Sequence, residues 1–386
     1  LRGLDWRVLA ALVLAPGVPL THPKPHWTVD MARAAGVEII GDIELFCRER
    51  ARIAPDAPFV AITGTNGKST TTALIHHIIA GAGIPARMGG NIGLPILSQE
   101  PLPEGGVYVL ELSSYQIDLT HSLGCDVAVL TNITPDHLDR YDGFSDYAAA
   151  KERLFTLQHV DQVAVIATED DPSKMIASRI NHRLYRVAST SVSDQSAWPA
   201  LQGPHNAQNV ACARAVAAVL GISDADVEKG LRSYPGLPHR MERVAERKGV
   251  LFVNDSKATN ADSTEKALAS FPGGIYWILG GRAKAGGITA LEAYFPRIAR
   301  AFLIGEASDA FAATLDGKVA YERCGRLDVA VARAAEVAAA APSSRSEKVV
   351  LLSPACASFD QFPDFEKRGE AFVDIVRRLE RVKGGG

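Results

Sequence analysis

A glycine-rich turn between an apolar run and a helix-like segment constrains the fold of this chain more than any other feature. The apolar run covers residues 59–62, the predicted helix covers 71–80, and the turn between them reads Gly64, Thr65, Asn66, Gly67, Lys68, Ser69 and Thr70. The glycines allow tight turning, and the helix N-terminus offers unpaired N–H groups to an anion. The lysine adds a positive charge, and a hydroxyl in the helix's first turn suits a magnesium ion. This pattern predicts a nucleoside triphosphate site on an α/β fold.

The turn departs in one respect from the general phosphate-loop pattern. That pattern would place its first glycine at position 62, where this chain has Ile62, and Gly64 stands closer to Lys68 instead. The strand-to-helix context of the lysine and the hydroxyls nevertheless favours phosphate binding over a turn that binds nothing.

Composition excludes several classes of protein. The chain has 386 residues, 47% of them hydrophobic, and a net charge of −3, which predicts a substantial core and two or three domains. No apolar run approaches the roughly 20 residues of a membrane helix, and no basic run suits nucleic acid. Its five cysteines are scattered without paired spacing, which argues against a zinc site or a disulfide framework. We therefore expect a cytoplasmic protein with no membrane or nucleic-acid partner.

Apolar runs alternate with helix-like segments on both sides of a proline-rich boundary at residues 234–238. Before this boundary the predicted strands are 59–62, 107–110, 127–130 and 163–166, with a helix over 206–220. After it they are 250–253, 275–279, 301–304 and 349–352, with a helix over 330–341. Near-continuous apolar strands that alternate with helices predict mostly parallel sheets covered on both faces. The second sheet is expected to be the smaller.

The start of the chain reads as a partial α/β unit. It holds a predicted strand over 8–14, a helix over 29–35 and a short apolar run over 37–40, and we expect that the first strands of such a unit are missing. Residues 52–58, which include two prolines, are the predicted linker. The predicted domains are therefore a partial first domain over 1–54, a central domain over 55–235 and a third domain over 236–386.

Polar side chains follow two predicted strands of the central domain. Glu111 comes directly after one strand and His137 a few residues after the next. Because parallel strands end at the same edge of a sheet, we expect both side chains to approach Lys68. Glu111 is the preferred carboxylate for Mg²⁺. On residue type alone, His137 fits a metal or substrate contact and an ordinary hydrogen-bonding group equally well, and Asp136 and Asp139 fit the start of the following helix.

Three further loops are dense in glycine or polar residues, at 89–93, 254–260 and 353–360. The glycines of the first permit close backbone approach to a ligand, although a plain loop has the same composition. The other two follow predicted strands of the third domain and favour a small polar ligand. The alternative for Asp255 and Ser358 is that each caps the helix after it.

Together these segments resemble the Mur ligases of peptidoglycan synthesis. The nucleotide loop is similar to one that folylpolyglutamate synthases share, so it indicates only the superfamily. The family member that adds D-glutamate is indicated by similarity in segments 89–93, 110–114, 136–141, 236–240, 254–260 and 353–362. The resemblance runs from about residue 9 to about residue 373. It implies three domains: a partial N-terminal Rossmann-like domain, a central P-loop ATPase-like parallel sheet and a C-terminal Rossmann-like domain.

The resemblance also implies an activity. An ATP-dependent amide ligase would phosphorylate the alanyl carboxylate of UDP-N-acetylmuramoyl-L-alanine, and D-glutamate would then attack the acyl phosphate. Lys68, His137 and Lys151 match the catalytic positions. Ser69 and Glu111 would hold one Mg²⁺. His137 would hold a second together with Lys151, which is carbamylated in the family. By its own sequence context Lys151 is predicted to be an exposed lysine on a helix.

The remaining matches fall into a nucleotide group and a substrate group. The nucleotide group is Gly64, Thr65, Asn66, Gly67, Lys68, Ser69, Thr70, Asn206, Arg240 and Asp255. The substrate group is Pro16 and Gly17 for the uridine part, Asn91 for the muramoyl part, and Lys257, Thr259, Lys284, Ser358 and Phe365 for D-glutamate. Residues 235–238 are the expected hinge, and we expect a monomer. The alternatives are a ligase for another amino acid or for folate, a non-catalytic nucleotide switch, and an inactive fragment.

Overall fold

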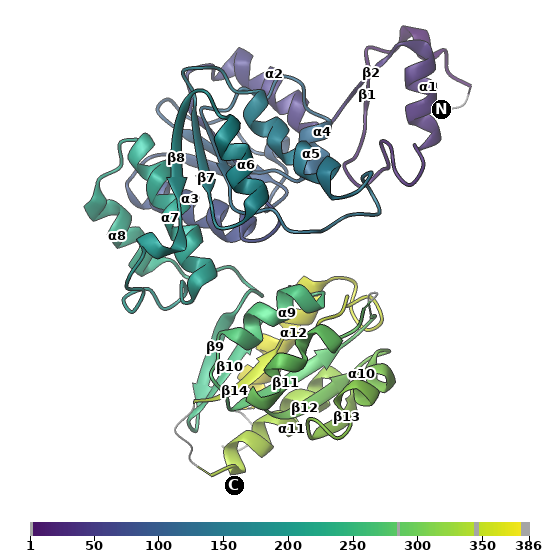
Figure 1. Cartoon of the computed structure of the whole chain (residues 1–386), viewed down its shortest axis with the longest axis vertical. Helices are drawn as coiled ribbons and strands as arrows, with labels where there is room; N and C mark the ends of the chain where they lie inside the picture. The colour runs from purple at the N-terminus through teal and green to yellow at the C-terminus, as the bar shows by residue number, and fades with distance from the viewer. Residues whose placement is uncertain (1–2, 284–285, 343–346, 380–386) are drawn as a thin grey trace. The chain divides into compact units, whose positions relative to one another are not determined.

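The computed structural model describes residues 3–283, 286–342 and 347–379. It divides into two compact units, Leu1–Tyr234 and Pro235–Gly386, each of which contains one large sheet and its covering helices (Figure 1). The α/β class predicted from the sequence is confirmed.

The first unit opens with a small α/β module. Its two short strands, β1 (Ala11–Val13) and β2 (Glu38–Ile40), pair in parallel around α1 (Trp27–Ala35), and α2 (Asp42–Ile53) follows. The predicted strand over 8–14 is wrong at its start. Trp6–Val8 form a turn of 3₁₀ helix because the Asp5 side chain accepts a hydrogen bond from the Arg7 N–H.

The large sheet of the first unit has six parallel strands in the order β4-β5-β3-β6-β7-β8. The strands are β3 (Phe59–Thr63), β4 (Ala86–Gly90), β5 (Val107–Glu111), β6 (Val127–Leu130), β7 (Val163–Ala167) and β8 (Arg183–Val187). Every residue of the four inner strands is buried. These are the four strands that the apolar runs predict.

Helices cover both faces of this sheet. One face packs against α2, α4 (Ser114–Asp118), α5 (Phe144–Thr156) and α6 (Asp171–Arg179). The helices α3 (Lys68–Gly81), α7 (Pro204–Val219) and α8 (Asp224–Ser233) pack together, and α3 and α7 contact strands of the sheet. Helix α3 begins at Lys68, so the last three residues of the glycine-rich segment already belong to its first turn.

The second unit also has a six-stranded sheet, so the prediction of a smaller second sheet is wrong. Its order is β13-β12-β11-β14-β10-β9, with only β9 antiparallel to its neighbour. The strands are β9 (Glu242–Arg247), β10 (Val250–Asn254), β11 (Ile275–Gly280), β12 (Ile298–Ile304), β13 (Tyr321–Gly325) and β14 (Lys348–Leu352). The edge strands β9 and β13 were not predicted.

The two faces of the second sheet have separate hydrophobic cores. One core includes α9 (Ala261–Ala269), the 3₁₀ segment Thr289–Arg297 and α10 (Ser308–Leu315), and the other includes α11 (Leu327–Ala340) and α12 (Phe365–Arg378). Among the helices of the described ranges, none combines the length and apolar character needed to span a bilayer.

A buried carboxylate attaches α2 to the large sheet. Glu44 is 1% exposed, and its oxygens accept hydrogen bonds from the backbone N–H groups of His121 (2.7 Å) and Ser122 (2.9 Å). The Ser122 hydroxyl (2.8 Å) and Arg48 Nε (2.8 Å) also donate to it. Burial opposes ionisation, but these four hydrogen bonds outweigh it and lower the pKa of Glu44 to about 2.

We expect Glu44→Gln to destabilise the first unit at neutral pH. The carboxyl group has its ordinary pKa in the unfolded chain and a lower one when folded, so its contribution, up to about 3 kcal/mol, is present above about pH 4.5. It is lost as the pH falls through the folded pKa. Thermal unfolding at pH 7 is expected to show a Tm lower by several degrees, with the difference closing toward pH 3.

Glu49→Gln is the matched control, because Glu49 lies on the same helix and forms an exposed ion pair with Arg52. Equal Tm losses for the two variants would contradict the assignment of Glu44, as would a Tm difference from the parent chain that was as large at pH 3 as at pH 7.

Candidate functional site

The turn after β3 needs its two glycines. Gly64 has a φ of 144°, and a Cβ there would lie 2.0 Å from Thr131 Oγ1. Gly67 has a φ of 83°, and its Cβ would lie 2.5 Å from Asn209 Oδ1. The turn therefore packs against the end of β6 and against α7 at distances that no other residue type permits.

The lysine of the turn folds back over it. Lys68 Nζ donates hydrogen bonds to the carbonyl oxygens of Gly64 (3.0 Å) and Thr65 (2.9 Å). Ser69 is buried in the first turn of α3, and Thr70 is half-buried beside it. A cation, a hydroxyl and the N-terminus of a 14-residue helix thus lie together, which is the arrangement that binds phosphate oxygens.

Asn132, which follows β6, stabilises this turn through hydrogen bonds to Asn66. The sequence analysis did not identify this residue. Its Oδ1 accepts from the Asn66 N–H (2.9 Å), and its Nδ2 donates to the Asn66 carbonyl (3.0 Å) and to Gln208 Oε1 (3.3 Å). Thr65 is held too: its N–H bonds the Asn132 carbonyl (2.8 Å), and its hydroxyl donates to the Thr134 carbonyl (3.1 Å). No motif marks Asn132, because its role depends on β6 lying beside β3.

We expect Asn132→Ala to raise the KM for ATP about tenfold while changing kcat less. The variant loses both hydrogen bonds that orient the Asn66 peptide, so the turn is no longer fixed before the phosphates arrive. Initial rates at varied ATP concentration measure the effect, with Asn181→Ala, at an exposed position, as the control. An unchanged KM for ATP would show that the turn keeps its shape without Asn132.

Glu111 ends β5, next to β3 in the sheet, with Ile62 as its register partner. The side chain is 2% exposed, and its Oε1 accepts a hydrogen bond from Asn91 Nδ2 (3.0 Å). Its Oε2 is buried and has no hydrogen-bond partner among the described residues. A buried carboxylate oxygen without a partner is costly, and a cation would satisfy it. Asn91 itself is exposed, and its N–H bonds the Glu111 carbonyl (2.8 Å).

His137 follows β6, the other neighbour of β3, and has a φ of 52°. Its ring lies 5.1 Å from the Tyr115 ring and 6.2 Å from the Tyr147 ring. Burial lowers its pKa, the charges of Lys151 and Lys68 lower it further, and Asp136 opposes them. Burial and the two lysine charges therefore favour the neutral form of the His137 ring. Asp136 and Asp139 do not start the following helix, because α5 begins at Phe144 with Gly143 as its N-cap.

Lys151 on α5 is buried, so the prediction of an exposed lysine is wrong. It is 2% exposed, and its ammonium lies 4.7 Å from the centre of the Tyr147 ring. In the described part of the chain we find no hydrogen-bond partner for it. Burial holds the pKa of Lys151 well below its usual range, and the charge of Lys68 lowers it further. Both effects favour the uncharged amine.

The candidate metal ligands are of mixed types. Within the described ranges, no group of three or more His, Cys, Asp or Glu side chains is placed to hold a metal ion. A magnesium site here would combine the Ser69 hydroxyl and Glu111 with phosphate oxygens and water. The partnerless oxygen of Glu111 fits such an ion.

The remaining predicted nucleotide and uridine residues of the first unit lie at two places. Asn206 is on α7, where its Oδ1 accepts from Asn209 Nδ2 (3.1 Å), and Asn209 is a buried residue that the sequence analysis missed. Pro16 lines a cavity of about 20 Å³ together with Tyr115, Arg140 and other residues. Arg140 Nη1 donates to the carbonyl of Gly17 (3.2 Å), which is exposed.

The predicted residues of the second unit lie on the loops after β10 and β14. Asp255 accepts hydrogen bonds from Ser353 Oγ (2.9 Å) and the Met241 N–H (3.2 Å). Burial raises its pKa to about 7, and the charge of Arg240 counteracts this shift. Lys257 Nζ lies 3.8 Å from the centre of the Phe365 ring, and Thr259 is half-buried.

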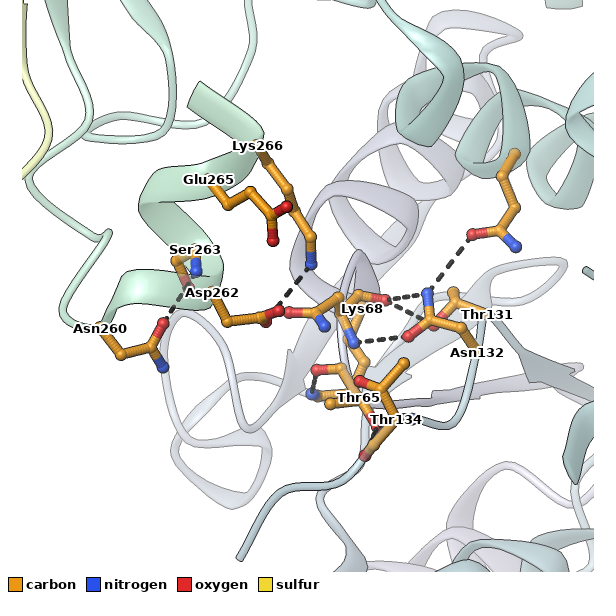
Figure 2. Close-up of polar contacts among 12 residues, drawn as sticks. Thr65, Lys68, Thr131, Asn132, Thr134, Asn260, Asp262, Ser263, Glu265 and Lys266 are labelled. Carbon is orange, nitrogen blue, oxygen red and sulfur yellow. Dashed lines mark hydrogen bonds and ion pairs between the residues drawn. The ribbon is translucent and has the colours of Figure 1, made fainter. Parts of the chain in front are cut away.

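Asp255 and Ser358 are not helix caps. Asn260 caps α9 by accepting from the Ser263 N–H (Figure 2), and Asp364 caps α12. Asp255 and Ser358 are buried in the loops before these caps. Lys284 lies outside the described residues.

Family models match most of both units. The model of the Mur ligase middle domain matches residues 62–211, and that of the Mur ligase glutamate ligase domain matches residues 239–356. The chain belongs to the Mur ligase family.

Curated relatives carry a more specific name. A protein of Sphingopyxis alaskensis named UDP-N-acetylmuramoylalanine–D-glutamate ligase is 59% identical over 382 residues, which are 97% of this chain and 86% of the relative. Proteins of the same name from Nitrobacter hamburgensis and Brucella abortus are 54% and 53% identical over 99% of the chain, and the matches cover 87% and 86% of their lengths.

Solved structures share the fold at low identity. The UDP-N-acetylmuramate–alanine ligase of Thermotoga maritima has a TM-score of 0.63 at 18% identity, with coverage of 92% of this chain and 83% of that one. A bifunctional folylpolyglutamate and dihydrofolate synthase of Yersinia pestis, solved with AMPPNP and manganese, has a TM-score of 0.61 at 16% identity. It covers 94% of this chain, and all of that chain is matched.

Proposed function

We propose that this chain is an ATP-dependent ligase that joins D-glutamate to UDP-N-acetylmuramoyl-L-alanine in peptidoglycan precursor synthesis. The observation that carries the proposal is 53–59% identity, over nearly the whole chain, to proteins named for that reaction. The glycine-rich turn supports ATP as the co-substrate.

The residues of the first unit suit the activation step. A carboxylate is a poor electrophile, so an oxygen of the alanyl carboxylate attacks the γ-phosphorus of ATP, and ADP leaves. Lys68 and the N-terminus of α3 bind the phosphate oxygens and offset the charge that moves between them. Ser69 and Glu111 hold one Mg²⁺, and His137 with carbamylated Lys151 holds a second. Magnesium, when bound, neutralises phosphate charge.

The second step forms the amide. The amine of D-glutamate attacks the acyl phosphate, and inorganic phosphate leaves. Lys257, Thr259, Ser358 and Phe365 bind the amino acid, and Lys284, outside the described residues, is a further cation for its carboxylates. Arg240, Asp255 and Asn206 contact the nucleotide, whereas Asn91, Pro16 and Gly17 contact the UDP-sugar.

Each substrate is assigned mainly to one part of the chain, and Asn91, Arg240 and Asp255 are additional contacts from outside that part. Residues 1–54 bind the UDP group, 55–235 bind ATP and 236–386 bind D-glutamate, with 235–238 as the hinge that lets these parts close. We also infer a monomer that works in the cytoplasm without a membrane or nucleic-acid partner. The net charge of −3 and the lack of a basic run support that inference.

Phosphate release that depends on the acceptor tests the function. The chain is incubated with ATP, magnesium and UDP-N-acetylmuramoyl-L-alanine, and each of D-glutamate, L-alanine and meso-diaminopimelate is added in turn. We expect phosphate release when D-glutamate is the added amino acid and none with the other two. Release with another amino acid would reassign the acceptor, release with a folate and glutamate would indicate a folate ligase, and ATP binding without any release would indicate a non-catalytic switch.

A further inference from the structure

A buried arginine in the second unit has an incomplete set of partners. Arg368 on α12 is 1% exposed, and its Nε donates to Ser256 Oγ (3.0 Å). Its Nη2 donates to the carbonyl oxygens of Ser256 (2.9 Å) and Cys356 (3.1 Å). The third nitrogen, Nη1, is buried and has no hydrogen-bond partner among the described residues.

The charge of Arg368 is not matched by a carboxylate in contact. Within the described ranges no acidic side chain forms an ion pair with it. The charge of Asp360 acts on it, but Asp360 Oδ2 accepts a hydrogen bond from the Glu306 N–H (3.1 Å). Burial lowers the pKa of Arg368 to about 10, so the group stays charged at neutral pH. A buried cation without a counter-ion is costly, and a hydrophobic side chain would fill the same place at less cost.

The loops around Arg368 indicate which negatively charged group balances its charge. Its partner Ser256 belongs to the loop after β10 and its partner Cys356 to the loop after β14. Ser256 Oγ also donates to the Phe365 carbonyl (2.8 Å) in the first turn of α12. Arg368 thus joins the loops that carry Lys257, Thr259 and Ser358 to the start of the helix that carries Phe365.

We propose that Arg368 is a positioning residue for the amino-acid acceptor. Its hydrogen bonds fix the loops after β10 and β14, and its buried charge attracts the acceptor's carboxylates. The inference rests on the proposed function, because D-glutamate is the acceptor with two carboxylates. Arg368 does not touch the amino acid, since its guanidinium is covered by the loops. Water is excluded around it, so its field reaches the bound carboxylates with little screening.

Two variants separate the charge from the hydrogen bonds. Arg368→Gln keeps donor groups and removes the charge, whereas Arg368→Lys keeps the charge and loses part of the hydrogen-bond network. We expect the glutamine variant to raise the KM for D-glutamate at least about tenfold and leave the KM for ATP within about twofold. The lysine variant is expected to recover most of the D-glutamate affinity. Arg368→Met serves as the neutral variant if the glutamine variant does not fold.

Lys367→Gln is the matched control, because it removes the same charge from an exposed neighbour on α12 that pairs with Glu370. D-Glutamine gives a second comparison, because it lacks one carboxylate and its KM should respond less to Arg368→Gln. An unchanged KM for D-glutamate in a folded neutral variant would overturn the inference. Equal losses in the lysine and neutral variants would also overturn it, leaving a structural role only. If the parent chain does not use D-glutamate at all, the proposed function itself is wrong.

Discussion

Lys68→Ala is expected to lower the rate of phosphate release at least about 1,000-fold while the chain stays folded. Lys68 lies at the start of α3, and its ammonium already spans the turn through the carbonyls of Gly64 and Thr65. When phosphates bind, this cation offsets the charge that builds up during phosphoryl transfer. Alanine supplies no charge at that point, so the transition state loses more stabilisation than the ground state.

Single-turnover phosphate release measures this loss, and thermal unfolding checks the fold. Lys174→Ala is the control, because Lys174 is a half-exposed lysine of the same unit that pairs with the exposed Asp171. Undiminished turnover in Lys68→Ala would remove the basis for the phosphate site. So would a bound non-hydrolysable ATP analogue whose phosphates lay far from the turn.

Lys151→Ala is expected to lower kcat at least about 100-fold, with partial recovery on addition of a small carboxylate such as acetate. Burial and the charge of Lys68 lower the pKa of Lys151, which favours the neutral, nucleophilic form of the amine. The amine nitrogen can therefore attack CO₂ and lose a proton, which converts the side chain to a carbamate anion that suits Mg²⁺. Truncation to alanine leaves a cavity in which acetate can supply equivalent oxygens.

Lys151→Met is the matched control, since it fills the same space with no charge and leaves no room for acetate. We expect it to be inactive with or without acetate and at least as thermostable as the parent, because a buried amine without a hydrogen bond destabilises the fold. Removal of dissolved CO₂ should slow the parent chain. Normal activity in Lys151→Ala would show that no carbamate is needed.

The buried strands could be predicted from the sequence because each is a run of apolar residues enclosed on both faces. The four strands that were missed, β4, β8, β9 and β13, are the outer strands of the two sheets. Their residues are mostly half-buried or exposed, so their composition resembles that of loops. Omitting β9 and β13 is why the second sheet was expected to be the smaller.

The site was only partly predictable for a different reason. The residues of the glycine-rich turn are contiguous, so the sequence alone identifies them as a phosphate-binding motif. The burial of Lys151, by contrast, depends on how α5 packs on the sheet, and its neighbours Glu152 and Arg153 suggest an exposed helix. Asn132 and Arg368 act on segments distant in the sequence, and no local pattern distinguishes them from other polar residues.

The outer strands also influence how copies of the chain meet. An edge strand exposes backbone groups to which a strand of another molecule could add. On β8 these groups lie among the side chains of Arg183 and Arg186, and on β13 among those of Glu322 and Arg323. Strand addition at β8 or β13 would strip water from these charges, so these two edges resist growing into the intermolecular ribbons from which aggregates form.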